Sequence, residues 1–318
     1  MNRRLLLLLA AVFGLGLIAA PAIFQMFSRA PKGGDMINEF RPFMTAEMVE
    51  TFQAHMAEID AAEAELRTEL PALLEERAGL APDAVSEQFA SLARFEDAWP
   101  GIEADMRDDL LVTMEQMVPN FEAVDALPPF PLFPWFFVGP GALVAVAAGT
   151  GLWRERRGRS PRRAAVAVAA LGVAIVLAPA VFQMFTRAPK GADMIDAFHP
   201  IMTTSRVTTV QGYFLTIGAG EGEWRTQVRP LLTASGEQLA DDLPAVERIS
   251  EDWPGISNDF APMIGAMSDN VDNYAAVDAL PPFSLFPWFF VLPGLLIAAL
   301  GAGAARAVKS ETPKGDRQ

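Results

Sequence analysis

Residue types that commonly carry chemistry are few in this sequence, and their spacing does not match a known kind of site. The two histidines, His55 and His199, lie far apart, and neither has a second ligand at the spacing of a metal site. Cysteine is absent, so the chain forms no disulfide and has no thiol nucleophile or lipid-bearing cysteine. We therefore expect both histidines to be ordinary surface or hydrogen-bonded side chains.

Acidic pairs and a glycine-rich stretch are the remaining candidates for chemistry. The acidic pairs at 108–109 and 241–242 lack the dense alternation of oxygen ligands, and the glycine, of a calcium loop. The stretch GAGEG at 218–222 lacks the preceding strand that a phosphate-binding loop requires, and it aligns with the helix-forming DAAEA at 60–64. The motifs HExxH, GxSxG and SxxK are absent. The sequence therefore predicts no catalytic residue, no cofactor and no metal, and we interpret the protein as non-enzymatic.

An internal repeat gives the clearest information about how the chain is organised. Residues 21–40 (PAIFQMFSRAPKGGDMINEF) return at 179–198 (PAVFQMFTRAPKGADMIDAF), with 15 of 20 positions identical. Residues 123–141 return at 276–294, with 17 of 19 positions identical. Each matched segment lies at the edge of a long apolar run. The chain is therefore one unit written twice, and we refer to its two halves as the first and the second copy.

Four apolar runs predict an integral membrane protein. Hydrophobic residues make up 51% of the chain and the mean hydropathy is +0.23. Each run has 20–22 residues without a charged side chain, and about 20 helical residues cross a hydrocarbon core of roughly 30 Å. The first run resembles a signal peptide. The same segment, PAxFQMFxRAPKG, also follows the internal run that begins at Ala164, which cannot be an N-terminal signal. We therefore expect the first run to be retained as a helix.

Lysine and arginine residues in the short flanks predict the orientation. Two arginines precede the first run, the loop 154–163 (RERRGRSPRR) holds six, and the tail 306–318 holds two arginines and two lysines. All three lie on one side of the predicted membrane, so we expect both termini in the cytoplasm. Segments 26–131 and 186–284 then lie outside, with charges of 7 − 22 = −15 and 6 − 14 = −8. Arginine outnumbers lysine 21 to 4, which together with the abundant alanine indicates a bacterium with GC-rich DNA.

The outside segments show the periodicity of helices. Phe52, Met56 and Ile59 in the first copy recur every three or four residues, as on one buried helix face. Thr45 is the expected cap of this helix, and Trp99-Pro100-Gly101 is expected to open a later one. No alternating pattern indicates a strand. We expect each outside segment to fold as its own antiparallel bundle, because about 100 residues can bury a sufficient core.

The predicted fold class is an all-α integral membrane protein with four transmembrane helices and two extracytoplasmic helical-bundle domains, arranged as a tandem parallel repeat. The predicted segments are the first transmembrane helix 1–25, extracytoplasmic domain 26–131, second transmembrane helix 132–153, Arg-rich cytoplasmic loop 154–163, third transmembrane helix 164–185, extracytoplasmic domain 186–284, fourth transmembrane helix 285–305 and cytoplasmic tail 306–318.

A proline-rich junction is the most specific local signal, LPPFPLFPWFF at 127–137 and LPPFSLFPWFF at 280–290. Its paired prolines are expected to end the last outside helix, because proline cannot donate a helical hydrogen bond. A later proline suits the first turn of the membrane helix. These helix-breaking residues are Pro128, Pro129, Pro134, Pro281, Pro282 and Pro287. The simplest interpretation is a rigid elbow, and the alternative is a groove for a lipid or hydrophobic ligand between the two copies.

Aromatic and basic side chains beside the junctions are the predicted membrane-interface anchors. Tryptophan favours the interface, and long cationic side chains there reach lipid phosphates. The anchors are Arg29, Lys32, Trp135, Arg187, Lys190 and Trp288. Specific contact with anionic lipid is the alternative to simple anchoring. We also expect Pro31-Lys32-Gly33 to break its helix, and the two tryptophans to be energetically coupled because a pseudo-two-fold axis brings equivalent residues together.

The predicted function is binding or scaffolding in the bacterial cytoplasmic membrane. The cytoplasmic parts are too short to fold as domains, so any activity takes place outside, within the membrane or through partners. Expected partners are the lipid bilayer, an envelope protein, a hydrophobic ligand or another copy of the chain, and no nucleic acid. The alternative is a transport or channel accessory subunit with a passage between the repeats. The apolar runs carry no ionisable group, which argues against an ion pathway.

Overall fold

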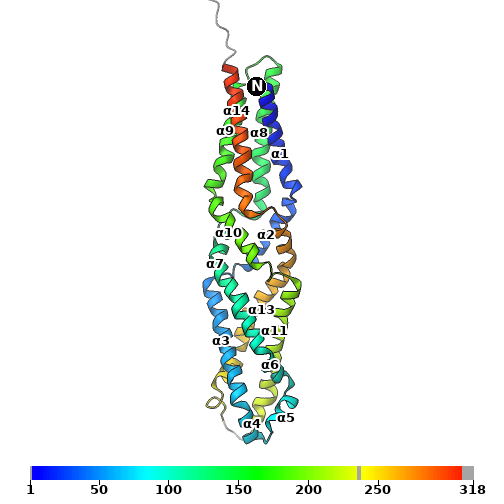
Figure 1. Ribbon diagram of the computed structural model, residues 1–318, viewed down its shortest axis with the longest axis vertical. Coiled ribbons are helices and arrows are strands. Elements are labelled where there is room, and N and C mark those ends of the chain that lie inside the picture. The colour runs from blue at the N-terminus through cyan, green and yellow to red at the C-terminus, as the bar shows by residue number, and fades with distance from the viewer. Residues whose placement is uncertain (1, 235–237, 310–318) are drawn as a thin grey trace, which may run out of the picture. The chain divides into compact units, whose positions relative to one another are not determined.

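The computed structural model describes residues 2–234 and 238–309, and every regular element within these ranges is a helix (Figure 1). This confirms the all-α prediction. The chain divides into two compact units, and each unit contains segments of both copies. Unit 1 comprises Met1–Asn38, Pro119–Asp196 and Asp272–Gln318, and unit 2 comprises Glu39–Val118 and Ala197–Val271.

Four long apolar helices form the larger part of unit 1 and pack side by side (Figure 1). They are α1 (Arg3–Ile23), α8 (Phe133–Arg156), α9 (Arg162–Val181) and α14 (Phe286–Lys309). Each contains one of the four apolar runs, and each is long and apolar enough to cross a membrane. The prediction of four such helices is therefore confirmed.

Small residues allow the two helices of each copy to approach closely. A Cβ added to Gly14 in α1 would lie 2.8 Å from the carbonyl oxygen of Gly141 in α8. A Cβ on Gly172 in α9 would lie 2.3 Å from the backbone nitrogen of Ala298 in α14, and 2.7 Å from the Gly294 oxygen. Lipid tails are as apolar as leucine, so close backbone packing of this kind holds membrane helices together.

The chain breaks its helix at Gln25, not at Pro31-Lys32-Gly33. Helix α2 (Met26–Phe40) continues through that motif, and α10 (Met184–Phe198) does the same in the second copy. Gln25 instead adopts the left-handed conformation, with φ of 54°. The expected break was therefore misplaced. Pro31 is the sixth residue of α2, and the helix continues although this residue has no N–H to donate to the carbonyl of Phe27.

The proline-rich junctions lie between helices, as their composition requires. Helices α7 (Val112–Asp125) and α13 (Pro244–Asp278) end just before them. A single 3-10 turn follows in each copy, and the apolar helix begins directly after it. The 3-10 turns are η2 (Phe130–Leu132) and η4 (Phe283–Leu285).

Unit 2 is one helical bundle built from segments of both copies, whereas the sequence suggested a separate bundle for each copy. Phe260 stacks on Phe52 of the other copy with ring centroids 4.7 Å apart, and lies 4.5 Å from Phe214. Each segment thus buries its apolar face against the other. The elements are α3 (Ala46–Thr68), α4 (Leu70–Ala78), α5 (Pro82–Gln88), α6 (Ala90–Asp105), the π-helical turn η1 (Met106–Leu111), α11 (Thr204–Glu223), the π-helical turn η3 (Trp224–Val228), α12 (Arg229–Leu232) and most of α13.

Helix ends within unit 2 are capped in equivalent ways in the two copies. The Thr45 hydroxyl accepts a hydrogen bond from the first turn of α3 at 3.2 Å, as Thr203 does for α11. Glu65 accepts two backbone N–H groups at the start of α13, at 2.8 and 3.1 Å. Its equivalent Glu223 accepts two at the start of α6, both at 2.8 Å. The glutamate of each copy therefore caps a helix of the other.

The motif Trp99-Pro100-Gly101 does not open a helix, because α6 begins at Ala90 and runs through it. Pro100 cannot donate to the carbonyl four residues earlier, that of Glu96. Arg67 supplies the missing hydrogen bond, with its Nη2 2.9 Å from this oxygen. The Glu223 cap at the start of α6 and this replacement donor explain why the helix tolerates an internal proline.

Candidate functional site

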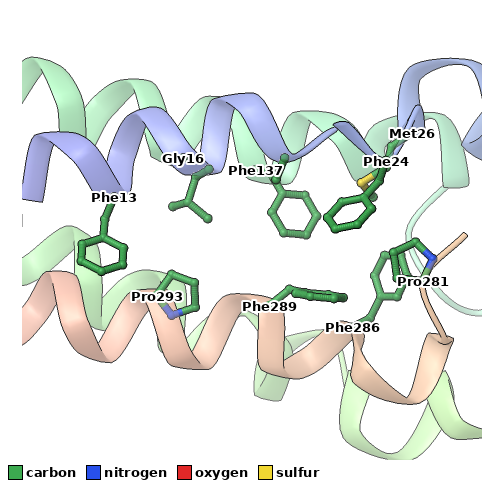
Figure 2. A pocket seen from close by; sticks show the side chains of 11 residues that line it. Phe13, Gly16, Phe24, Met26, Phe137, Pro281, Phe286, Phe289 and Pro293 are labelled. Carbon is green, nitrogen blue, oxygen red and sulfur yellow. The ribbon is translucent and has the colours of Figure 1, made fainter. Parts of the chain in front are cut away.

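Two apolar grooves in unit 1 lie beside the predicted junctions. Figure 2 shows the first groove, where side chains of α1 and α14 face each other. Its volume is about 160 Å³. The lining residues are Phe13, Gly16, Leu17, Ala20, Phe24, Met26, Phe137, Pro281, Phe286, Phe289 and Pro293. The first groove therefore lies between the first helix of one copy and the last helix of the other.

A second groove, of about 230 Å³, lies between α8 and α9. Nine residues of the first groove have their equivalents here, so the second groove is the same site built with the copies exchanged. It is lined by Phe136, Pro140, Leu143, Leu171, Ala174, Ile175, Ala178, Phe182, Met184 and Phe290. The structure thus provides two equivalent apolar sites.

A strained glutamine lies at the rim of each groove. Gln25 and Gln183 have φ of 54° and 53°, a conformation that costs a residue with a side chain roughly 1–2 kcal/mol. The break places the side chains on both sides of Gln25, those of Phe24 and Met26, in the wall of the first groove. Strain that recurs at equivalent positions beside a cavity indicates a functional constraint. The sequence carried no signal for it, because glutamine has no preference for this conformation.

An arginine of each copy binds the end of a helix from the other copy. Arg29 donates from Nη1 to the carbonyl oxygen of Ala279 at 2.6 Å, and Arg187 donates to that of Ala126 at 2.5 Å. These carbonyls follow the last residues of α13 and α7, where backbone acceptors lack helical partners. Both arginines were predicted as interface anchors. The structure adds a specific acceptor for each.

Lys32 and Lys190, the other predicted basic anchors, are half-buried on α2 and α10. In the part of the chain that the structure describes, no carboxylate lies within ion-pair distance of either lysine, or of Arg29 and Arg187. Four positive charges near the groove rims are therefore not neutralised by described residues.

The predicted tryptophan anchors contact residues of their own copy. The Trp135 side chain is 57% exposed and meets Phe27 edge-on at 5.6 Å. Trp288 is 48% exposed and meets Phe185 at 5.9 Å. No ring contact joins the two tryptophans among the described residues. No direct contact therefore explains the expected energetic coupling between the two tryptophans.

Phe137 and Phe290 form an aromatic contact between the copies that sequence reasoning missed. Their rings stack at 4.5 Å with an interplanar angle of 30°. Phe137 lines the first groove and Phe290 the second, so this pair forms a shared wall. The signal was present, because both residues occupy the same position of the repeated FPWFF motif.

The junction prolines lie where the prolines of such elbows are expected. Pro134 lies in the first turn of α8, and Pro287 is the second residue of α14. Four prolines occupy the connections before the 3-10 turns, namely Pro128, Pro129, Pro281 and Pro282. Of the six, only Pro281 lines a described groove.

Polar residues of unit 2 form structural networks. His55 Nε2 lies 2.9 Å from Asp259 Oδ2, and Tyr213, which aligns with His55, donates to Asp105 Oδ2 at 2.7 Å. Burial, followed by the hydrogen bond to Asp105, raises the pKa of the Tyr213 phenol. His199 is exposed. No group of three acidic or histidine residues in the described ranges is arranged to hold a metal ion.

Members of both acidic pairs bind arginine. Asp109 accepts from Arg206 at 2.8 Å, and Asp242 accepts from Arg77 at 2.6 Å. These carboxylates therefore stabilise contacts between the two copies within unit 2. One carboxylate of each acidic pair is thus used in a structural ion pair.

Buried and half-buried glutamates show one difference in charge between the copies. Burial raises the pKa of Glu63, and also that of its equivalent Glu221. Burial and then the charge of Glu63 raise the pKa of Glu96. Ser250 takes the place of Glu96 in the second copy and lies 3.5 Å from Glu221. The first copy therefore holds two neighbouring carboxylates where the second holds one carboxylate and a hydroxyl.

No protein-family model matches this sequence, and no curated protein is detectably similar to it. The class that the fold defines is an all-helical protein with four helices suited to cross a membrane.

Proposed function

We propose that this chain is a non-enzymatic membrane protein that binds a hydrophobic ligand at two equivalent sites. In this proposal the sequence repeat is also a structural one, with a pseudo-two-fold axis that relates the copies. The orientation is that predicted by the arginine-rich loop, with both termini in the cytoplasm of a bacterium. The helical bundle of unit 2 then lies outside and contacts an envelope partner or another copy of the chain.

The pair of equivalent grooves is the observation that carries this proposal. Both are lined by apolar side chains alone, and they lie between helices of different copies. Their volumes, about 160 and 230 Å³, fall below the roughly 300–1,000 Å³ of pockets that enclose a compact ligand. Each groove therefore suits part of a long hydrocarbon chain whose remainder lies in the bilayer.

An apolar lining favours a binding role over an ion passage, because ion pathways require polar or charged groups. The transport alternative remains a separate proposal. It would require a polar route along α1, α8, α9 and α14, and polar side chains are rare in these helices.

A neutral photoactivatable diacylglycerol tests the binding role without any contribution from a charged headgroup. We expect its adducts to map to the groove-lining parts of α1 and α14 and of α8 and α9. Gly16→Trp should remove adducts from the first groove and Ala174→Trp from the second. Gly149→Trp is the matched control, because nothing lies within 4 Å of a Cβ at Gly149 and this residue lines neither groove. Adducts spread evenly over the four helices, and unchanged by both variants, would refute the proposal.

The orientation is tested separately with an impermeant maleimide in intact cells. The chain lacks cysteine, so single substitutions are clean probes. Glu50→Cys and Thr208→Cys, at exposed positions of unit 2, should be labelled, and Ser160→Cys should not. Labelling of Ser160→Cys alone would reverse the proposed orientation.

A further inference from the structure

The rim of the first groove combines an apolar slot with an unneutralised cation. Met26 lines the groove, and Arg29 lies one helical turn further along α2. The acceptor of Arg29 is Ala279, and Pro281, two residues later, lines the groove as well. Each partner of this hydrogen bond is therefore within three residues, along the chain, of a residue that lines the groove. The contact with the opposite copy thus fixes the guanidinium beside segments that both contribute to the groove wall.

The Arg29 guanidinium retains donors for a ligand. It has five N–H groups, and the hydrogen bond to Ala279 uses one of them. Its side chain is half-buried. Lys32 lies three residues later on the same face of α2. Neither has a carboxylate partner in the described ranges, although Asp35 lies only three residues beyond Lys32. Two positive charges on one face thus remain available to an anion.

The second groove repeats the arrangement with the copies exchanged. Met184 lines the groove, Arg187 follows one turn later, and Arg187 binds the Ala126 carbonyl of the first copy. Lys190 corresponds to Lys32. The same combination of slot, arginine and lysine therefore occurs twice, formed from different parts of the chain.

We propose that each groove and its adjoining arginine form a site for a phosphate-bearing lipid, with a hydrocarbon chain in the groove and the phosphate on Arg29 or Arg187. This deepens, and rests on, the proposed binding of a hydrophobic ligand in the grooves. Arginine is suited to phosphate because its planar N–H groups donate two parallel charge-assisted hydrogen bonds. Lys32 and Lys190 add a second, less directional charge.

The glutamine break has a positioning role in this site. In a continuous helix, residues two positions apart point about 200° apart, so Phe24 and Met26 would lie on opposite sides and would not both face one slot. The left-handed Gln25 redirects the chain between them, and α2 then carries Arg29 to the rim. Ser28 stabilises the turn by donating its hydroxyl to the Gln25 carbonyl at 2.9 Å, as Thr186 does for Gln183 at 3.0 Å.

Native mass spectrometry of the full chain in detergent tests the proposal, with phosphatidylglycerol and a diacylglycerol of the same chains as probes. We expect up to two lipids per chain, with phosphatidylglycerol bound roughly tenfold more tightly, as expected for hydrogen bonds to a charged group. Arg29→Gln should remove this preference at one site, and the double variant with Arg187→Gln at both. Diacylglycerol binding should not change.

Further variants separate recognition from folding. Lys32→Gln removes a charge without removing any described hydrogen bond, and should weaken phosphatidylglycerol binding by a smaller factor. Arg29→Lys keeps the charge and should retain part of the preference. Arg94→Gln, an exposed arginine of α6 in unit 2, is the matched control and should have no effect.

The possible failures are distinguishable. If neither lipid binds, the grooves are not hydrophobic sites and the proposed function itself fails. If both lipids bind equally and the arginine variants change nothing, the grooves bind chains but the phosphate site is refuted. An equal loss in Arg94→Gln would show non-specific attraction by charge, which also refutes the site. Displacement of the lipid by inorganic phosphate at equal concentration would overturn the assignment to a lipid headgroup.

Discussion

The two copies form more similar contacts in unit 1 than in unit 2. In unit 1, equivalent contacts keep both their position and their residue types: Phe27 meets Trp135 edge-on, and Phe185 meets Trp288 in the same way. In unit 2, the helix caps are the same in both copies, but other equivalent contacts keep their position and change their chemistry. The clearest pair is His55 with Asp259, against Tyr213 with Asp105.

The difference indicates where the two copies must do the same thing. The grooves share nine equivalent lining positions, six of them with the same residue type, and we propose that they bind the same kind of ligand. Unit 2 needs only to keep its helices together, and its surface differs between the copies. A bundle with two unlike faces can orient a single partner. We infer that unit 1 provides two equal sites and that unit 2 provides an asymmetric surface for a partner.

Loss of the aromatic core that the two copies share in unit 2 should have the largest effect on stability. Phe260 is fully buried and contacts Phe52 and Phe214 from both copies. Phe260→Ala should lower the free energy of unfolding of unit 2 by about 3–5 kcal/mol, the usual cost of removing a core aromatic ring. Leu215→Ala is the control, because this side chain is 75% exposed. Thermal unfolding followed by circular dichroism measures both.

The same contacts predict that residues 33–126 alone are less stable than in the full chain. An isolated first segment that unfolds with the midpoint of the full chain would show that the copies do not share a core. It would restore the interpretation of two separate bundles.

Close helix packing in unit 1 should be the next most sensitive feature. Gly172→Ala places a methyl group 2.3 Å from the Ala298 nitrogen, and overpacking of this kind costs typically about 1–3 kcal/mol. Gly149→Ala on α8 meets nothing within 4 Å and should be tolerated. Thermal stability in detergent should separate the two variants, and equal midpoints would contradict the packing of α9 against α14.

Removal of the exchanged carboxylate caps should have a moderate effect. Glu65→Ala and Glu223→Ala each leave two backbone N–H groups of the other copy without a partner. Loss of a cap costs about 0.5–2 kcal/mol. Glu50→Ala, an exposed residue of α3, should change the midpoint little. A loss in one cap variant only would show that the copies do not stabilise each other reciprocally.

The pH-dependent contribution of Glu96 to stability should be the smallest effect. The pKa of Glu96 is raised above its ordinary value of 4.5, so the folded state holds this proton more tightly than the unfolded state. The associated stability is present below pH 4.5 and is lost as pH rises through the raised pKa.

Glu96→Ser copies the second copy, which has Ser250 at this position. It should raise the free energy of unfolding at pH 7 by about 0.5 kcal/mol or less, as for other half-exposed positions, and the gain should disappear near pH 4. Denaturant titrations at the two pH values measure this difference. A gain of equal size at both would exclude the charge as its cause.

Much of the fold follows from the sequence, because it depends on local patterns. Runs without charge predict the four apolar helices, and the stripe of Phe52, Met56 and Ile59 predicts a buried helix face that the structure confirms. Proline positions were less informative. Pro31 and Pro100 both lie inside helices, and at Pro100 the lost hydrogen bond is replaced by one from Arg67.

The sites were only partly predictable, because they depend on which copy contacts which. The sequence indicated the basic residues and a groove between copies, but it could not give Arg29 its acceptor on the opposite copy. Nor could it show that Gln25 breaks the helix. Two almost identical segments have the same local preferences, so nothing in either one states whether it packs within its own copy or against the other.

Cysteine crosslinking in native membranes tests most directly whether the two copies exchange contacts. A Cβ on Gly33 would lie 3.2 Å from a methyl group of Val277 in the second copy, and the chain has no native cysteine. We predict that Gly33→Cys with Val277→Cys forms a disulfide that still joins the halves after cleavage of a protease site inserted in the loop 154–163. The matched pair within one copy, Gly33→Cys with Val124→Cys, should not crosslink. Crosslinking of Gly33→Cys to Val124→Cys, with none to Val277→Cys, would show that each copy folds on itself and would contradict the exchange.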